Sequence, residues 1–175
     1  MQRAFVAVGS NADPENNVRK AVHLLRRLTR IVSISTVYLT EPEGPPGQPS
    51  FYNFVIELET DLAPLDMKFQ LLRPIETALG RVRTADKFAP RTIDLDLILY
   101  DDVILNTVDL TLPDPQIFRR PFVAIPLAEL APALVPPGMA STVARVAAAM
   151  ESKTMTPLPD MTALLKKEIE SGRHA

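Results

Sequence analysis

The chain has 175 residues, of which 46% are apolar and 23% charged, as in an ordinary globular protein long enough to bury a core. Its formal net charge of −2 favours neither nucleic acid nor an anionic membrane as a partner. There is no cysteine, which excludes a disulfide scaffold, a thiolate metal site and a cysteine nucleophile.

Histidine chemistry and membrane insertion are equally hard to support. His23 lies in a helical pattern and His174 is next to last, so a histidine metal site or triad is difficult to assemble. No apolar run approaches the ~20 residues of a membrane span. Residues 1–5 lead straight into a strand pattern and do not resemble a signal peptide. We therefore expect a cytoplasmic protein that binds neither membrane nor nucleic acid.

The first hundred residues alternate strand and helix patterns. Strands are expected at residues 3–9, 31–39, 51–59 and 92–100, and helices at about 14–30 and 64–79. Asp13 is a good N-cap, and Pro14 suits the first position of the helix that follows. Pro74 interrupts the second helical pattern and predicts a kink or a lost hydrogen bond, and Gly80 is a plausible stop.

The second part of the chain has shorter elements. Short strands are expected near 103–105 and 110–112, and helices at about 121–130, from Ser141, and from a cap at Asp160. The order β-α-β-β-α-β predicts an α+β, ferredoxin-like core sheet with helices packed on its faces in three α/β/α layers, the first two helices sharing one face. We expect one domain over residues 1–160, and a helix or tail of uncertain role over 161–175.

The fourth expected strand carries the most informative pattern. Because side chains alternate along a strand, Ile93, Leu95, Leu97 and Leu99 are predicted to share one face, while Asp94 and Asp96 share the other. Same-face residues two apart have Cα atoms roughly 6.5–7 Å from each other. Two carboxylates this close repel each other, and a divalent cation relieves the repulsion. Oxygen ligands with retained waters and substrate phosphates suit magnesium.

A plain alternative is a solvated strand face whose carboxylates pair with nearby arginines, because short acidic motifs often occur by chance. The preceding loop favours the metal reading. It contains Arg81, Arg83, Lys87 and Arg91, whose charges can neutralise polyphosphate oxygens. An acidic metal site beside a basic loop suits phosphoryl transfer. Neither common glycine-rich phosphate loop is present, so side-chain cations and metal would have to hold the phosphates.

Several motifs in order resemble the family of 6-hydroxymethyl-7,8-dihydropterin pyrophosphokinases, enzymes of folate biosynthesis. The matching stretches are 8–11 (VGSN), 38–42 (YLTEP), 48–53 (QPSFYN), 75–76 (IE), 80–83 (GRVR), 89–98 (APRTIDLDLI), 120–122 (RPF) and 126–132 (PLAELAP). The resemblance covers roughly residues 3–137 and makes the expected domain a pyrophosphokinase domain.

The resemblance implies that the chain transfers diphosphate from ATP to the hydroxymethyl group of the pterin. Asp94 and Asp96 would hold two Mg²⁺ ions and, with Arg81 and Arg91, would be the catalytic residues. The phosphates would be contacted by four arginines and a lysine, namely Arg81, Arg83, Lys87, Arg91 and Arg120. Glu76 would support the nucleotide region. The pterin would contact Thr40, Pro42, Glu43, Phe51, Asn53 and Phe122, the two phenylalanines by stacking. We expect a monomer.

The chain departs from the family pattern around the nucleotide. Asp114 stands where the family usually has histidine, and Phe88 where it has tryptophan. Ala89 and Pro121 each replace a common glycine. Two rivals to the pyrophosphokinase therefore stay open. One is a metal-dependent phosphohydrolase that uses the same carboxylates, and the other is a non-catalytic relative that binds the pterin.

Overall fold

The computed structural model describes residues 1–171, and His174, noted in the sequence, lies outside this range. The strands are β1 (Gln2–Ser10), β2 (Arg30–Ile34), β3 (Tyr38–Thr40), β4 (Phe51–Thr60), β5 (Asp94–Tyr100), β6 (Leu105–Asn106), β7 (Thr111–Leu112) and β8 (Met155–Pro157). The helices are α1 (Pro14–Leu28), α2 (Pro64–Asp66), the π-helical η1 (Met67–Leu72), α3 (Arg73–Ala78), the 3₁₀ turn η2 (Pro115–Phe118), α4 (Pro121–Leu130), α5 (Val143–Ala148) and α6 (Pro159–Ser171).

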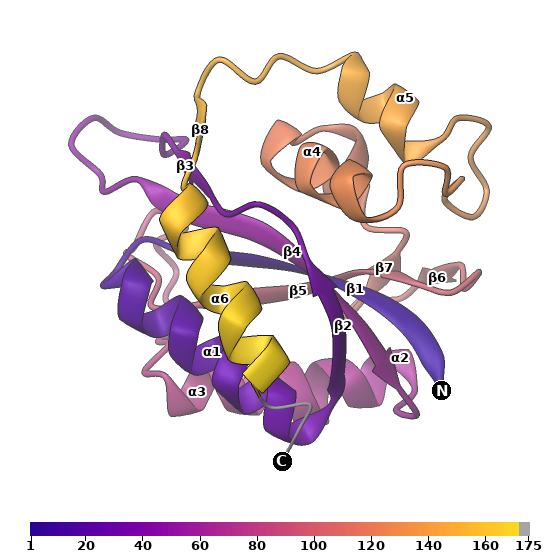
Figure 1. Cartoon of the computed structure of the whole chain (residues 1–175), viewed down its shortest axis with the longest axis horizontal. Coiled ribbons are helices and arrows are strands. Elements are labelled where there is room, and N and C mark those ends of the chain that lie inside the picture. Colours follow the sequence, from indigo (N-terminus) through magenta and orange to yellow (C-terminus); the bar gives the residue numbers. More distant parts are fainter. Residues whose placement is uncertain (172–175) are drawn as a thin grey trace.

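The main sheet is antiparallel, in the order β5-β1-β4-β3-β8, and β2 also pairs with β4. Helices cover both of its faces: α1, α3 and α6 lie on one side and α4 and α5 on the other (Figure 1). The predicted β-α-β-β-α-β core and its three layers are therefore confirmed. Strands β6 and β7 form a separate small hairpin.

Alternation along the central strands divides the apolar residues between two cores. On β1, Val6 and Val8 enter the core beneath α1, α3 and α6, whereas Phe5 enters the core beneath α4 and α5. The same division holds on β4, where Phe54 joins the first core and Val55 the second. Both faces of the sheet are thus covered, as the three-layer prediction requires.

The prediction that Leu99 shares a face with Leu95 and Leu97 is wrong. The pairing of β1 with β5 shifts register between Phe5 and Val6, so that Leu99 packs in the core beneath α4. A β-bulge leaves one extra residue in a strand and reverses the alternation beyond it. The extra residue is Ile98, which lies beyond both aspartates, so Asp94 and Asp96 keep their common face.

The second predicted helix exists, but it is not one regular α-helix. A π-helical turn separates α2 from α3, and the amide of Arg73 donates to the carbonyl of Lys68, five residues earlier. Pro74 has no amide hydrogen, and its ring would clash with a carbonyl of a regular helix. The wider turn just before Pro74 accommodates it, as π-bulges commonly do.

Other predicted boundaries moved by a few residues. The second strand is split into β2 and β3, and β5 begins at Asp94 rather than at 92. Asp13 is the N-cap of α1, but its carboxylate accepts from the side chain of Asn16 and not from a backbone amide. The helix expected from Ser141 begins after a Thr142 cap. Within residues 1–171, no helix is long and apolar enough to cross a membrane.

Candidate active site

One cavity of about 520 Å³ opens on the α4 face of the sheet, at the end where β1, β4 and β5 lie side by side. Its walls come from these strands, from β3, η2 and α4, and from the loops over 41–50 and 87–91. They consist of Ala7, Val8, Gly9, Thr40, Glu41, Glu43, Gly44, Gln48, Phe51, Asn53, Lys87, Phe88, Ala89, Arg91, Asp94, Asp96, Gln116, Arg120, Phe122 and Val123.

Asp94 and Asp96 line this cavity together. They lie opposite Gly9 and Ala7 on β1, and both are half-buried. Burial raises the pKa of Asp96 to about 7, and the negative charges of Asp94, Asp114 and Glu76 add to the effect. The two carboxylates thus share a poorly solvated space in which their negative charge needs a partner.

One partner of this charge is already present, because Arg91 Nη1 lies 2.8 Å from Asp94 Oδ2. The plain alternative of an arginine-paired carboxylate therefore describes part of the arrangement. Among residues 1–171, Asp96 forms no ion pair, and its carboxylate accepts a hydrogen bond from the side-chain amide of Gln116. Within residues 1–171, no three histidine or acidic side chains are grouped to hold a metal. A cation here would rest on two carboxylates, a donor set that suits magnesium with retained water and phosphate oxygens.

Three of the five predicted phosphate-binding cations line the cavity, namely Lys87, Arg91 and Arg120. Arg120 also forms an ion pair with Glu43. Arg81 and Arg83 are not in the cavity wall. Arg83 Nη2 is 2.6 Å from Glu76 Oε2, and Arg81 Nε is buried without a partner in the described part of the chain.

Glu76 also lies outside the cavity wall, behind the edge strand of the sheet. Its carboxylate is buried and accepts from the backbone amide of Leu95 at 2.8 Å, besides the bond from Arg83. Burial raises its pKa. Because β5 is an edge strand, the Leu95 amide has no neighbouring strand to bond. Glu76 satisfies this amide next to the two aspartates.

An apolar slot with a polar end occupies the other part of the cavity. Phe51 and Phe122 line it, both half-buried. Asn53 Nδ2 donates to Thr40 Oγ1 at 2.7 Å, and both residues are buried. Gly9 lies beneath Asn53, and a Cβ there would be only 2.9 Å from Asn53 Oδ1. Glycine at position 9 therefore leaves room for the amide.

Two loops meet over the cavity. Gln48 Nε2 donates to the carbonyl of Phe88 at 3.0 Å, and the Phe88 ring covers Gly44 so closely that a Cβ at Gly44 would be 2.5 Å from it. Glu43, predicted from the resemblance, lies in the cavity wall, whereas Pro42 does not.

Sequence reasoning did not identify Gln116, which lines the cavity and donates to Asp96. It lies in a proline-flanked turn, and no local pattern marks its side chain as functional. A second cavity of about 270 Å³ lies against Asp96 from the opposite edge of β5, with Lys68 and Asp114 in its wall. Asp96 lies in the walls of both cavities.

Known proteins resemble this chain over most of its length. Residues 5–132 match the family model of 7,8-dihydro-6-hydroxymethylpterin-pyrophosphokinase (HPPK). A Pseudomonas aeruginosa 2-amino-4-hydroxy-6-hydroxymethyldihydropteridine pyrophosphokinase is 43% identical over 137 residues, which cover 77% of this chain and 83% of the relative. A Bacillus subtilis protein of the same name is 38% identical over 130 residues, which cover 73% and 77%.

Solved structures agree on the fold. The structure of wild-type HPPK-DHPS from Plasmodium falciparum with pteroate superposes with a TM-score of 0.68 at 13% identity. The match covers 84% of this chain but only 44% of that longer one, so this chain spans less than half of it. On the strength of the sequence matches, the chain belongs to the HPPK family.

Proposed function

We propose that the chain transfers a diphosphate group from ATP to the hydroxymethyl group of 6-hydroxymethyl-7,8-dihydropterin. The products are AMP and the pterin diphosphate, in a step of tetrahydrofolate biosynthesis. One observation carries this proposal: a single cavity combines the carboxylate pair of Asp94 and Asp96, three cations and an aromatic slot that ends in an amide and a hydroxyl. Family membership supports the same reaction.

The carboxylate pair is the proposed magnesium site. Asp94 and Asp96 would share two Mg²⁺ ions, with water and phosphate oxygens completing the coordination. Bound magnesium would neutralise the polyphosphate and stabilise the charge that develops on the transferred group. Gln116 would keep Asp96 oriented by its hydrogen bond.

The cations divide into those already at the cavity and those that must move. Lys87, Arg91 and Arg120 lie in its wall and would contact phosphates there. Arg81 and Arg83 would reach the phosphates only if the loop over 81–91 changes conformation, since Arg83 is paired with Glu76. Glu76 acts from behind the strand by holding the Leu95 amide.

The pterin fits the aromatic slot. Phe51 and Phe122 would stack on the two faces of its ring, and Asn53 and Thr40 would bond its polar edge, aided by backbone groups near Pro42 and Glu43. The hydroxymethyl oxygen then bonds to the β-phosphorus as the bond from that phosphorus to the α–β bridging oxygen breaks. AMP leaves, and the hydroxyl proton passes to solvent. We propose that a monomer is active.

An AMP assay tests the reaction. The protein is incubated with ATP, Mg²⁺ and 6-hydroxymethyl-7,8-dihydropterin, and AMP is measured with and without the pterin. Pterin-dependent AMP is expected. Phosphate release without pterin would indicate the phosphohydrolase instead, and pterin binding without AMP would indicate a non-catalytic relative.

Variants of the carboxylate pair test the metal site. Asp94→Ala and Asp96→Ala are each expected to lower kcat by at least about a thousandfold, because phosphate neutralisation is lost while the fold is kept. Asp102→Ala is the matched control, since Asp102 is exposed just after β5, and it should retain full activity. Full activity in both pair variants would exclude the assignment.

A further inference from the structure

The second strand of the sheet is broken beside the pterin end of the cavity. Residues 35–37 separate β2 from β3 and are called the junction here. Buried backbone amides and carbonyls must find partners when they leave a β-ladder. The amide of Ser35 still donates to Val55, and the hydroxyl of Ser35 accepts from the amide of Val55 at 2.9 Å. The next two residues of the junction bond outside the sheet.

Side chains from opposite faces hold these two residues. The amide of Thr36 donates to Glu129 Oε2 of α4 at 2.9 Å. The amide of Val37 donates to Thr162 Oγ1 of α6, also at 2.9 Å, in a buried contact. Thr162 Oγ1 in turn donates to the carbonyl of Leu158 at 2.8 Å. Each helix layer thus holds one amide of the junction.

The segment that leads to Thr162 also runs along β3. Strand β8 pairs with β3, with Leu39 opposite Thr156 and Thr40 opposite Met155. The amide of Leu158 donates to the carbonyl of Val37 at 2.8 Å. Figure 1 shows β8 beside β3 at one end of the sheet, with α6 continuing from it across the face that carries α1.

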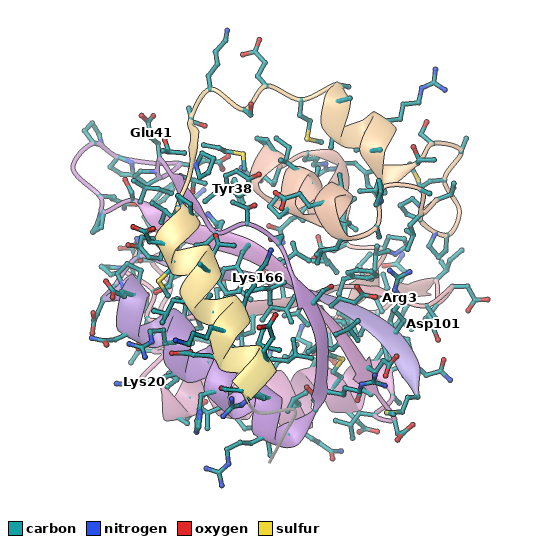
Figure 2. The ribbon with its side chains drawn as sticks, viewed as in Figure 1. Arg3, Lys20, Tyr38, Glu41, Asp101 and Lys166 are labelled. Atoms are coloured by element: carbon teal, nitrogen blue, oxygen red, sulfur yellow. The ribbon has the colours of Figure 1, made fainter. Side chains whose placement is uncertain are left out.

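A tyrosine on β3 ties the strand to the opposite layer. Tyr38 donates through its hydroxyl to Glu129, whose other oxygen accepts from Thr36. Burial and the neighbouring Glu129 raise the pKa of Tyr38 to about 12, so the hydroxyl stays protonated as a donor. Tyr38 and Glu41 are labelled in Figure 2 near this end of the sheet, where β3 leads into the loop over the cavity.

The strand held in this way carries half of the polar end of the cavity. Thr40 is 3% exposed, and its hydroxyl accepts a hydrogen bond from the side-chain amide of Asn53. The orientation of that amide depends on where β3 places Thr40. A shift of the junction would therefore move the Thr40–Asn53 pair before it altered the carboxylates on β5.

We propose that Thr162 of α6 is a positioning residue for pterin recognition, because it holds the junction from which β3 carries Thr40 to Asn53. The inference rests on the proposed function and extends it to a helix beyond residue 132, where the family match ends. Thr162 is not part of the cavity wall and would act through the backbone of Val37.

The test compares substrate dependences in the full chain. Thr162→Val keeps the shape of the side chain but leaves the buried Val37 amide unpaired. It is expected to raise the KM for the pterin at least about fivefold, with the KM for ATP unchanged within about twofold. Thr162→Ser restores the hydroxyl and is expected to restore the pterin KM.

Ile169→Ala is the matched control for lost stability. Ile169 is buried on α6, about two turns beyond Thr162, and does not supply the hydroxyl that binds the Val37 amide. It should lower the melting temperature without a selective change in the pterin KM. If Thr162→Val does not fold, Tyr38→Phe removes the bond to Glu129 on the opposite side of the junction and should raise the pterin KM in the same selective way.

An unchanged pterin KM in Thr162→Val would overturn the inference. So would an equal rise for both substrates, or the same selective rise in Ile169→Ala. These outcomes are distinct from failure of the proposed function, in which the unmodified chain itself makes no pterin-dependent AMP.

Discussion

Asp96 is the residue at which stability and the proposed function oppose each other most directly. Its pKa rises from the ordinary 3.8 to about 7 in the folded chain, first through burial and then through the charges of Asp94, Asp114 and Glu76. Between pH 3.8 and about 7, the folded chain holds a proton that the unfolded chain has lost. The stability contributed by this group is therefore present at low pH and is lost as pH rises through that window.

Replacing this carboxylate by its neutral isostere should stabilise the chain without ligands. Asp96→Asn is expected to raise the melting temperature relative to the unmodified chain at pH 8. At pH 4, where folded Asp96 is already protonated, this gain in melting temperature should be smaller. Each kcal/mol of relieved repulsion corresponds to about 2–4 °C. Thermal unfolding at both pH values, without metal, measures the effect.

Asp102→Asn controls for the loss of one exposed negative charge, and it should show no such pH dependence. Mg²⁺ with ATP should raise the melting temperature of the unmodified chain, because a ligand that binds the folded state stabilises it. The melting temperature of Asp96→Asn should not rise, because this variant lacks one of the proposed metal ligands. If the gain in melting temperature of Asp96→Asn over the unmodified chain is no larger at pH 8 than at pH 4, then the charged Asp96 carboxylate does not destabilise the fold as inferred.

At the scale of elements, the 3₁₀ turn η2 explains what Asp114 does. Its carboxylate caps the turn by accepting from the amide of Gln116 at 2.8 Å, and burial raises its pKa. The side chain of Gln116 reaches Asp96, so the cap supports a hydrogen bond to one of the two cavity carboxylates. Asp114 also adds a negative charge beside Asp96 in the smaller cavity.

Two variants of Asp114 separate its role as a cap of η2 from the effect of its negative charge. Asp114→Asn keeps an oxygen for the Gln116 amide and removes the charge, so the KM for ATP is expected to fall several-fold, by an amount set by one charge in partly solvated surroundings. Asp114→Ala loses the cap as well and should cost about 1 kcal/mol of stability. Steady-state kinetics and urea unfolding measure the two effects.

A higher ATP KM in Asp114→Asn, with stability unchanged, would mean that the carboxylate itself contributes to nucleotide binding. Asp102→Asn again provides the control, since it removes an exposed charge remote from any cap.

At the scale of the whole molecule, the two ends of the chain share one core. Leu165 of α6 is fully buried with Val22 and Leu25 of α1. Glu168 Oε1 of α6 lies 2.7 Å from Arg19 Nη2 of α1. This ion pair is partly exposed to solvent and contributes little, so the docking of α6 depends mainly on apolar burial. Helix α6 is therefore packed into the core next to the sheet.

Truncating Leu165 should lower the free energy of unfolding by an amount typical of a buried core leucine. Leu165→Ala is expected to lower the free energy of unfolding by about 2–5 kcal/mol, measured by urea denaturation. Leu164→Ala makes the same chemical change at a partly buried neighbour and should cost less than half as much. Equal losses would mean that α6 is not docked through its buried face.

Local patterns were enough to predict the elements and the central motif. The two-residue period of β5 placed Asp94 and Asp96 on one face, and proline and glycine marked the ends of helices. These signals depend on backbone geometry within a few residues, which the sequence states directly. They also located Pro74, although the π-helical turn before it depends on how the helix packs.

Other features arise from contacts that no local pattern encodes. The bulge that turns Leu99 to the other core depends on the pairing of β5 with β1, and the break between β2 and β3 depends on Glu129 and Thr162. The cavity partners of Asp96 likewise come from distant segments.

The sequence by itself therefore determined the strand and helix order, the acidic pair and the family resemblance, because each is written in spacing along the chain. The tertiary structure alone decided which cations reach the cavity and that Glu76 lies behind β5. It also decided how α6 meets the junction. Burial, charge coupling and long-range hydrogen bonds exist only after distant residues have been brought together.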